Sequence, residues 1–264
     1  MERGAPRLDR DARLHDRRGG AEGQLKKLLK TLQLTPLGDA AVYAEFGDSR
    51  TAASGGVDLE TNQSLQALAA ALRARGLPWV RDIVPALCGV AVHFDPFHPA
   101  LPARVLEEFP ALLEDAFKAA GKFEDSGRTV EVPVCYDAIY ALDMDEVSGT
   151  TRLSPSQIQK LHVSSKHLVL MVGFSPGQPY IGGLDPKLAV PRRATPRTVM
   201  PAGSVAIANA QTAVYPYETP GGWSIIGRTP LRVFDPAREP ASLFAPGDRV
   251  HFIPISRDEF ESLA

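Results

Sequence analysis

Hydrophobic positions in the first half of the chain follow strand and helix periods in turn. Short apolar or alternating runs predict strands at residues 40–46, 80–86, 89–96 and 128–136. Apolar residues at helical spacing over 65–72 and 105–117 predict two helices, one before the second strand and one before the fourth. The resulting order, β-α-β-β-α-β, is typical of a ferredoxin-like sandwich, which we expect over residues 35–135.

The second half of the chain loses the helical pattern after one short helix at 154–165, where Ser154 can cap the helix and Pro155 suits its first position. Residues 173–230 contain eight glycines and nine prolines, a density that favours short strands and tight turns. Candidate strands lie at 167–172, 204–208, 212–216, 223–228, 231–235 and 249–255. Because closure removes the exposed edges of such strands, we expect a small β-barrel over 136–264.

The first 34 residues fit neither pattern. Their beginning is rich in arginine with acidic residues interspersed, and it carries no apolar segment that would serve as a secretory signal. Leucines at helical spacing over 25–34 predict a short amphipathic helix. We therefore expect a disordered or helical extension over 1–34.

Composition excludes several classes of partner. The chain is 44% hydrophobic and 23% charged with a formal net charge of −2, so it has no overall attraction to nucleic acid or anionic lipid. Its apolar runs are shorter than the roughly 20 residues that span a bilayer. Cys88 and Cys135 lie in apolar runs and read as buried free thiols of a reducing compartment, which predicts a cytoplasmic location.

The stretch GFSPG, residues 173–177, matches the Gly-x-Ser-x-Gly pattern of a hydrolase nucleophile elbow. An elbow needs a backbone N–H directly after the serine and a helix beyond it, but Pro176 has no N–H and the next residues are rich in Gly and Pro. Ser175 is therefore not predicted to be a nucleophile. We expect a loop that approaches a ligand closely, with Gly173, Phe174, Gly177 and Tyr180 as binding residues.

Polar residues on the following loops are the other candidates. Guanidinium groups suit carboxylate or phosphate, and a glutamine can both donate to and accept from an amide. The predicted catalytic residues are His162, Gln211 and Arg228. The predicted substrate-binding residues are Arg192, Arg193, Thr212, Tyr215 and Thr229. The alternatives are that each arginine is a surface charge, that His162 is structural and that Trp223 packs in the core.

Two familiar kinds of site are missing from the sequence. No G-x-x-x-x-G-K-[ST] loop cradles a nucleotide phosphate, and no H-E-x-x-H or close Cys/His cluster offers metal ligands. We therefore predict no metal site, and any nucleotide must be held in another way or by a partner.

Residues 173–236, with the series PRRATPR, PAGSVAIA, QT, PGGW and IGRTP, closely resemble the family of bacterial 5-oxoprolinase B subunits. That family is also called allophanate hydrolase subunit 1 or the Kip-type kinase inhibitor family. The resemblance includes TPLGDAAVYAEFGD, VRDIVPALCGVAVHFDP, VPVCYD and LHVSSKHLVLMVGF, so it covers about residues 35–255. Two positions depart from the family pattern: Gln178 stands where an aromatic is usual, and His167 where a tyrosine is common.

The resemblance implies a ferredoxin-like domain followed by a cyclophilin-like barrel. It also implies a heteromer with two partners, the C subunit of related fold and the A subunit, which together use ATP as cosubstrate to open 5-oxo-L-proline, a lactam, to L-glutamate. We expect the chain alone to be inactive, and we expect Arg228 and Gln211 to face one pocket walled by the Gly173–Gly183 loop. The alternatives are an inhibitor of a sensor histidine kinase and a component of a urea- or allophanate-degrading amidohydrolase.

Overall fold

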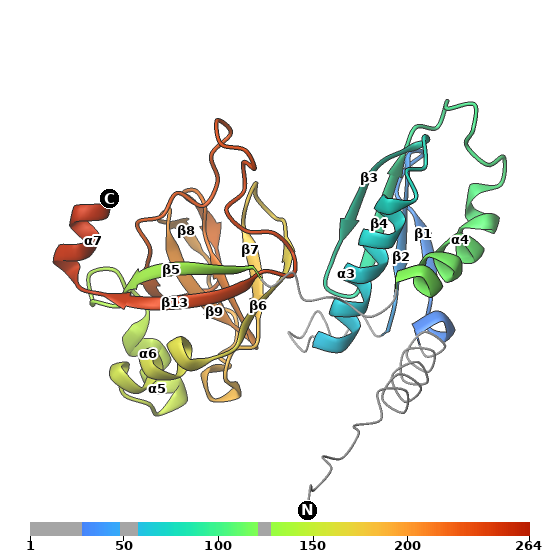
Figure 1. The fold of residues 1–264 in the computed structure, drawn as a ribbon. Coiled ribbons are helices and arrows are strands. Elements are labelled where there is room, and N and C mark those ends of the chain that lie inside the picture. Colours follow the sequence, from blue (N-terminus) through green and yellow to red (C-terminus); the bar gives the residue numbers. More distant parts are fainter. Residues whose placement is uncertain (1–27, 48–57, 121–127) are drawn as a thin grey trace, which may run out of the picture.

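The computed structural model describes residues 28–47, 58–120 and 128–264, which form an α+β domain followed by a closed β-barrel (Figure 1). This confirms the expected fold class. Most of the predicted extension lies outside the described residues; of its last part, residues 28–30 are helical and a strand begins at Gln33. Among the described residues, no helix has the length and apolar character needed to cross a membrane.

The N-terminal domain is an antiparallel sheet of order β1-β2-β4-β3. Its strands are β1 (Gln33–Pro36), β2 (Ala41–Glu45), β3 (Val80–Pro85) and β4 (Gly89–Phe94). Helices α3 (Leu59–Ala74) and α4 (Val105–Ala120) pack on one face of this sheet. The leucines that predicted α3 are fully buried against Val42 and Val92, because alternate strand residues point to the same face.

The predicted element order of this domain is wrong in two places. Strand β1 was not predicted, since its four residues are mostly exposed and carry little hydrophobic signal. Strand β5 (Thr129–Cys135) was expected to complete this sheet, but it pairs with β12 and β13 in the barrel. The observed order is therefore β-β-α-β-β-α.

The barrel contains seven strands in the order β10-β7-β6-β13-β5-β12-β9, closed by pairing between β9 and β10. Besides β5 they are β6 (His167–Val172), β7 (Pro179–Gly182), β9 (Ser204–Ala208), β10 (Gln211–Val214), β12 (Ser224–Arg228) and β13 (Arg249–Ile255). Strands β5 and β13 run parallel, and the other recorded pairs are antiparallel. Short strands β8 (Arg197–Met200) and β11 (Thr219–Gly221) form a separate ribbon.

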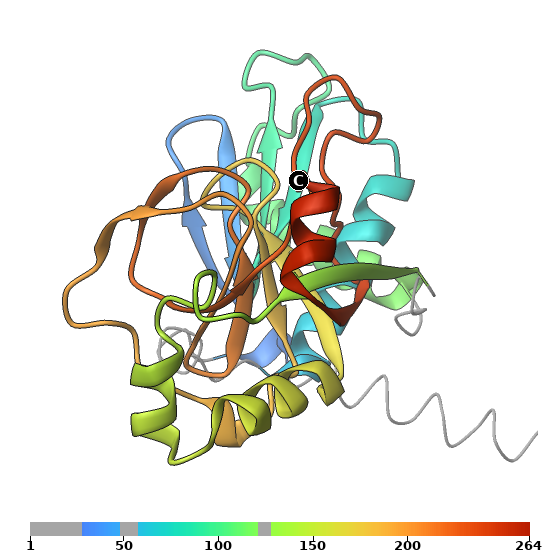
Figure 2. The ribbon, with the colours of Figure 1, turned by 90° about the vertical axis from the view of Figure 1, so that its left-hand side faces the viewer.

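Helices flank the barrel and help to close its core. Helix α5 (Met144–Thr151) and helix α6 (Pro155–Ser164) lie together beside the barrel, and a 3-10 turn η1 (Pro186–Leu188) packs near them. Ser154 caps α6 with Pro155 at its start, as predicted. The C-terminal helix α7 (Arg257–Leu263) lies against β5 (Figure 2).

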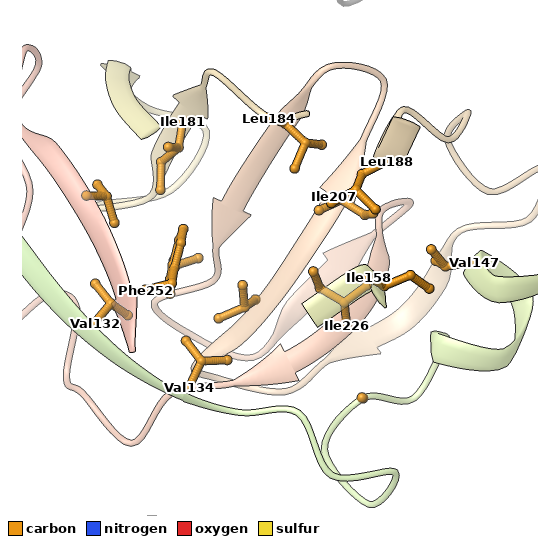
Figure 3. Packing of buried hydrophobic residues seen from close by; sticks show 14 of the residues in the cluster. Val132, Val134, Val147, Ile158, Ile181, Leu184, Leu188, Ile207, Ile226 and Phe252 are labelled. Atoms are coloured by element: carbon orange, nitrogen blue, oxygen red, sulfur yellow. The ribbon is translucent and has the colours of Figure 1, made fainter. Parts of the chain in front are cut away.

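Alternate residues of the strands fill the barrel interior. Figure 3 shows Val132 and Val134 of β5, Ile181 of β7 and Phe252 of β13 converging there. Ile158 of α6 joins the same cluster and is fully buried. Burial of each such side chain stabilises the fold by about 1.5–3 kcal/mol.

The predicted strand at 231–235 is wrong. This segment makes one isolated bridge, between Phe234 and Ser242, and is otherwise a loop. Its Val233 is buried in the barrel core, and its Phe234 ring packs against Gly177. The alternating apolar residues therefore reflect contacts with the barrel rather than membership in its sheet.

Two side chains of α3 bind the barrel directly. The carbonyl oxygen of Leu170 in β6 accepts from Gln66 Nε2 at 2.8 Å and from Asn62 Nδ2 at 3.3 Å. Both amides are buried. These hydrogen bonds fix α3 against β6.

Candidate functional site

The strands at one side of the barrel carry polar and aromatic side chains on their outer face. Along β10, Thr212 lies next to His162 of the core, whereas Ala213 belongs to a second cluster with Tyr180, Tyr215 and Trp223. Since strand residues alternate between faces, Gln211 lies on the same face as Ala213. We call Tyr180, Arg192, Gln211, Tyr215 and Trp223 the outer-face cluster.

Aromatic rings and one cation make up most of this cluster. The Tyr180 and Trp223 ring centroids are 5.8 Å apart in an edge-to-face arrangement, and the Arg192 guanidinium lies 5.9 Å from the Trp223 centroid. Trp223 therefore both packs in the structure and holds a cation. Ala206, Ala208 and Ala213 lie on the same face and are buried in this cluster.

The two tyrosines keep their hydroxyl protons throughout the neutral range. Burial raises the pKa of Tyr215 to about 12, with Tyr180 adding to the rise and Arg192 opposing it. Burial also raises the pKa of Tyr180, against the opposing charge of Arg192. Both hydroxyls can therefore donate hydrogen bonds to a bound ligand.

Gln211 carries the least satisfied polar group of the cluster. Its side chain is 5% exposed, and its Nε2 is buried without a hydrogen-bond partner. A buried donor left unpaired costs about 1–3 kcal/mol. A ligand that presents an oxygen to this nitrogen would recover that free energy.

His162 lies in the barrel core and not in the outer-face cluster. It is fully buried, with Nδ1 2.7 Å from the Tyr136 hydroxyl and Nε2 3.2 Å from Thr212 Oγ1. Its ring lies against Phe252 at 4.4 Å between centroids. Burial holds the pKa of His162 well below its usual range, so the ring is neutral. This environment supports the structural alternative for His162, and it directs Thr212 inward rather than toward a ligand.

Arg193 pairs with acidic residues of the chain. Its Nη1 lies 2.6 Å from Asp143 Oδ1 and also pairs with Glu146. Arg197 pairs with the same Asp143 carboxylate, which accepts the backbone N–H of Ile225 at 2.8 Å as well. Asp143 thus anchors the segment that carries Arg192, and Arg193 serves this anchor instead of facing a ligand.

The structure does not bring Arg228 and Gln211 together. On β9, Ser204 pairs with Arg228 and Ala208 pairs with Gln211, so the two residues lie at opposite ends of that strand. At about 3.3 Å per residue this separates them by roughly 13 Å along the strand. The expectation that both face one pocket is therefore wrong.

Arg228 lines a cavity of about 490 Å³ that does not include Gln211. Thr229 lines it too; its Oγ1 accepts the backbone N–H of Leu231 at 3.2 Å, and the residue is buried. Four aromatic residues, Tyr140, Tyr217, Phe234 and Phe260, contribute to the walls. Nothing in the hydrophobic pattern indicated that these rings would meet, because they come from separate loops and from α7.

The GFSPG loop packs against Phe234, but none of its residues is among those that line the cavity. A Cβ on Gly177, whose φ is +79°, would lie 2.7 Å from the Cβ of Phe234, so only glycine fits there. Phe174 also has a positive φ, +72°, and its side chain is 70% exposed. Gly173 donates its N–H to the Gln178 carbonyl at 3.0 Å, which closes the turn.

Ser175 is placed as its sequence context predicted. Its hydroxyl donates to Gln178 Oε1 at 3.2 Å, and strand β7 follows the loop in place of a helix. Among the described residues, no group of three His, Cys, Asp or Glu side chains could hold a metal ion.

The sequence of residues 32–244 matches the family described as carboxyltransferase domain, subdomain C and D. The chain is thus a protein with carboxyltransferase C and D subdomains. It is 35% identical to the 5-oxoprolinase B subunit of Bacillus subtilis (strain 168) over 236 residues, which cover 87% of this chain and 95% of that protein. The chain belongs to the family of 5-oxoprolinase B subunits.

A second curated relative bears the same name, and two solved structures share the fold. The 5-oxoprolinase B subunit of Escherichia coli O157:H7 is 47% identical over 131 residues, which are 50% of this chain and 60% of that protein. The crystal structure of TTHA0988 superposes with a TM-score of 0.67 at 35% identity, covering 82% of this chain but 40% of that longer chain. The Kluyveromyces lactis urea amidolyase structure shares the fold, with a TM-score of 0.68 at 19% identity over 88% of this chain and 15% of that one.

Proposed function

We propose that this chain is the B subunit of an ATP-dependent 5-oxoprolinase, which opens 5-oxo-L-proline to L-glutamate in a heteromer with the C and A subunits. Membership in the family of B subunits supports this reaction. The observation that carries the substrate assignment is the buried, unpartnered Nε2 of Gln211 in the outer-face cluster. Cys88 and Cys135, both free thiols, support a location in the reducing cytoplasm.

The chemistry of the cluster suits a small cyclic amide that carries a carboxylate. The lactam carbonyl oxygen would accept from Gln211 Nε2, and the exposed Arg192 guanidinium would bind the carboxylate. The protonated hydroxyls of Tyr180 and Tyr215 add donors on the same face.

Donors at the lactam oxygen also serve the reaction. Amides resist water, but transfer of the γ-phosphoryl group of ATP to the lactam carbonyl oxygen, with release of ADP, activates the carbonyl carbon. Water then adds to that carbon, the C–N bond of the ring breaks as the nitrogen takes a proton, and a second water hydrolyses the resulting acyl phosphate to glutamate and phosphate. A fixed N–H donor at the lactam oxygen would orient the ring for these steps. The cluster offers no imidazole, thiol or carboxylate to act as base, so the remaining groups would come from the partner subunits.

The test is to purify the chain with candidate A and C subunits and to measure ATP hydrolysis that depends on 5-oxoproline, with urea as the substrate control. We expect activity from the assembled complex and little from the chain alone. A complex that hydrolyses ATP with urea but not with 5-oxoproline would refute the proposed function.

A variant tests the site within that assay. Gln211→Met keeps the side-chain volume but removes the donor, and a neutral hydrogen bond is worth about 0.5–1.5 kcal/mol. We therefore expect the KM for 5-oxoproline to rise roughly 2- to 12-fold. Gln33→Met, on the exposed strand β1, is the matched control and should leave the KM unchanged. Equal KM values for Gln211→Met and the parent would refute this placement of the substrate.

A further inference from the structure

The cavity at Arg228 is unused by the substrate site described above. It lies at the other end of β9 from Gln211, and its volume of about 490 Å³ falls within the range of about 300–1,000 Å³ that holds drug-sized ligands. This is more space than one five-membered lactam requires. The chemical character of the lining residues indicates which class of larger molecule could bind in this cavity.

Arg228 is held in place but keeps donors for a ligand. Its Nε donates to the Ala202 carbonyl at 2.7 Å, and its guanidinium lies 6.0 Å from the Phe260 ring centroid. Within the part of the chain that the structure describes, no carboxylate is recorded within ion-pair distance of Arg228. Its two terminal nitrogens can thus bind an anionic group in the bidentate manner typical of arginine.

Two aromatic pairs form walls of the cavity. The ring centroids of Tyr140 and Phe260 lie 4.2 Å apart, and the Arg228 guanidinium lies over the Phe260 ring. The ring centroids of Tyr217 and Phe234 lie 6.1 Å apart, with an angle of 60° between the ring planes, and Tyr217 is 38% exposed. The second pair is therefore the surface on which a flat ring could stack.

We propose that this cavity binds a nucleoside phosphate, with its base against Tyr217 and Phe234 and its phosphate at Arg228. The inference rests on the proposed function, in which ATP is the cosubstrate, and it assigns the nucleotide to this chain. A second arginine, Arg232, lines the same cavity, although it pairs with Asp235 at 3.5 Å. Among the described residues that line the cavity, none has an acidic side chain, and Ala264 at the end of α7 also lines it.

Direct binding to the full chain tests the proposal, with ATP, AMP, adenosine, inorganic phosphate and benzoate measured separately by calorimetry. We expect ATP and AMP to bind, and adenosine and inorganic phosphate to bind at least about 10-fold more weakly because each lacks one half of the ligand. Adenosine binding as tightly as AMP would overturn the role of Arg228. Binding of benzoate but not of ATP would overturn the assignment to nucleotides.

Variants separate the two halves of the site. Arg228→Gln should weaken ATP binding about 10- to 100-fold, the range of a charge-assisted hydrogen bond, and Arg228→Lys should weaken it despite the retained charge. Tyr217→Ala removes an exposed ring and should weaken ATP binding at least about 5-fold, the lower end for loss of base stacking. Arg104→Gln, an exposed residue of the N-terminal domain, is the control. ATP affinities of Tyr217→Ala and Arg228→Lys equal to that of the control would overturn the proposal.

Steady-state kinetics of the assembled complex distinguish this inference from the proposed function. Arg228→Gln should raise the KM for ATP and leave the KM for 5-oxoproline unchanged. An active complex whose KM for ATP does not change in Arg228→Gln would overturn the nucleotide site while the proposed function stands. A complex without 5-oxoproline-dependent activity would refute the proposed function, whereas Arg228-dependent ATP binding to the chain would still support the nucleotide site.

Discussion

Replacing Asp143 with asparagine should destabilise the barrel domain far more than one neutralised charge on the surface would. The Asp143 carboxylate is buried and accepts from Arg193, Arg197 and the backbone N–H of Ile225. Asparagine keeps one oxygen for Ile225, but its NH₂ group then faces guanidinium donors. Arg197 loses its carboxylate partner, and Arg193 keeps only Glu146.

The expected loss of stability in Asp143→Asn follows from how deeply the ion pairs are buried. Removing one partner of a buried ion pair costs about 3–5 kcal/mol. Arg193 and Arg197 are 22% and 29% exposed, so water can reach both and the lower figure of about 3 kcal/mol applies. At about 2–4 °C per kcal/mol for a protein of this size, Tm should fall by roughly 6–12 °C.

Thermal unfolding followed by circular dichroism measures this change. Glu146→Gln is the matched control, because Glu146 pairs with the same Arg193 but is 55% exposed, and an exposed pair contributes at most about 1 kcal/mol. The segment with Arg192 lies beside this anchor, so Asp143→Asn should also raise the KM for 5-oxoproline in the assembled complex. Equal, small shifts of Tm in the two variants would refute the assignment of Asp143 as the anchor.

Two further predictions concern His167 and Ser175. Burial lowers the pKa of His167 to about 4, whereas a histidine in the unfolded chain has a pKa of about 6.5. As the pH falls, the unfolded chain therefore takes up the proton before the folded chain does. The free energy of unfolding should drop by about 3 kcal/mol between about pH 6.5 and pH 4 because of this residue. Tm measured across that range should fall less steeply in His167→Gln, and identical pH profiles would contradict the argument. Ser175→Ala should leave kcat of the complex nearly intact, because Pro176 supplies no oxyanion donor; a loss of about 100-fold, the scale of removing a catalytic group, would show otherwise.

Local patterns predicted most elements of this fold but not all of their partners. The alternation in β5 correctly indicated a strand, yet nothing in Thr129–Cys135 says which sheet it joins, because pairing partners are set by the tertiary structure. Strand β7 was not predicted since Pro179 and Gly182 flank two residues that pair with β6 and β10. The segment 231–235 shows the opposite error, since its apolar residues pack on the barrel without joining it.

For the candidate site too, the sequence indicated which residues are involved but not how they are arranged in space. Gln211 was predicted to be catalytic, and Tyr180 and Tyr215 to bind substrate; the strand register puts all three on one face. The distance between Gln211 and Arg228 could not be predicted, because it depends on the register of β9 with both its neighbours. Asp143 carried no signal in the sequence; its role follows from two arginines that reach it from some 50 residues away.

The parallel pairing of β5 with β13 has a consequence during synthesis on the ribosome. All strands of the N-terminal sheet have been made by residue 94, so that domain can fold early. The barrel cannot close until β13 has emerged, although β5 is complete at residue 135. At about 5–20 residues per second this leaves the edge of β5 open for roughly 6–24 s. A nascent chain paused in this interval would expose an apolar strand edge, the kind of edge that pairs with other chains.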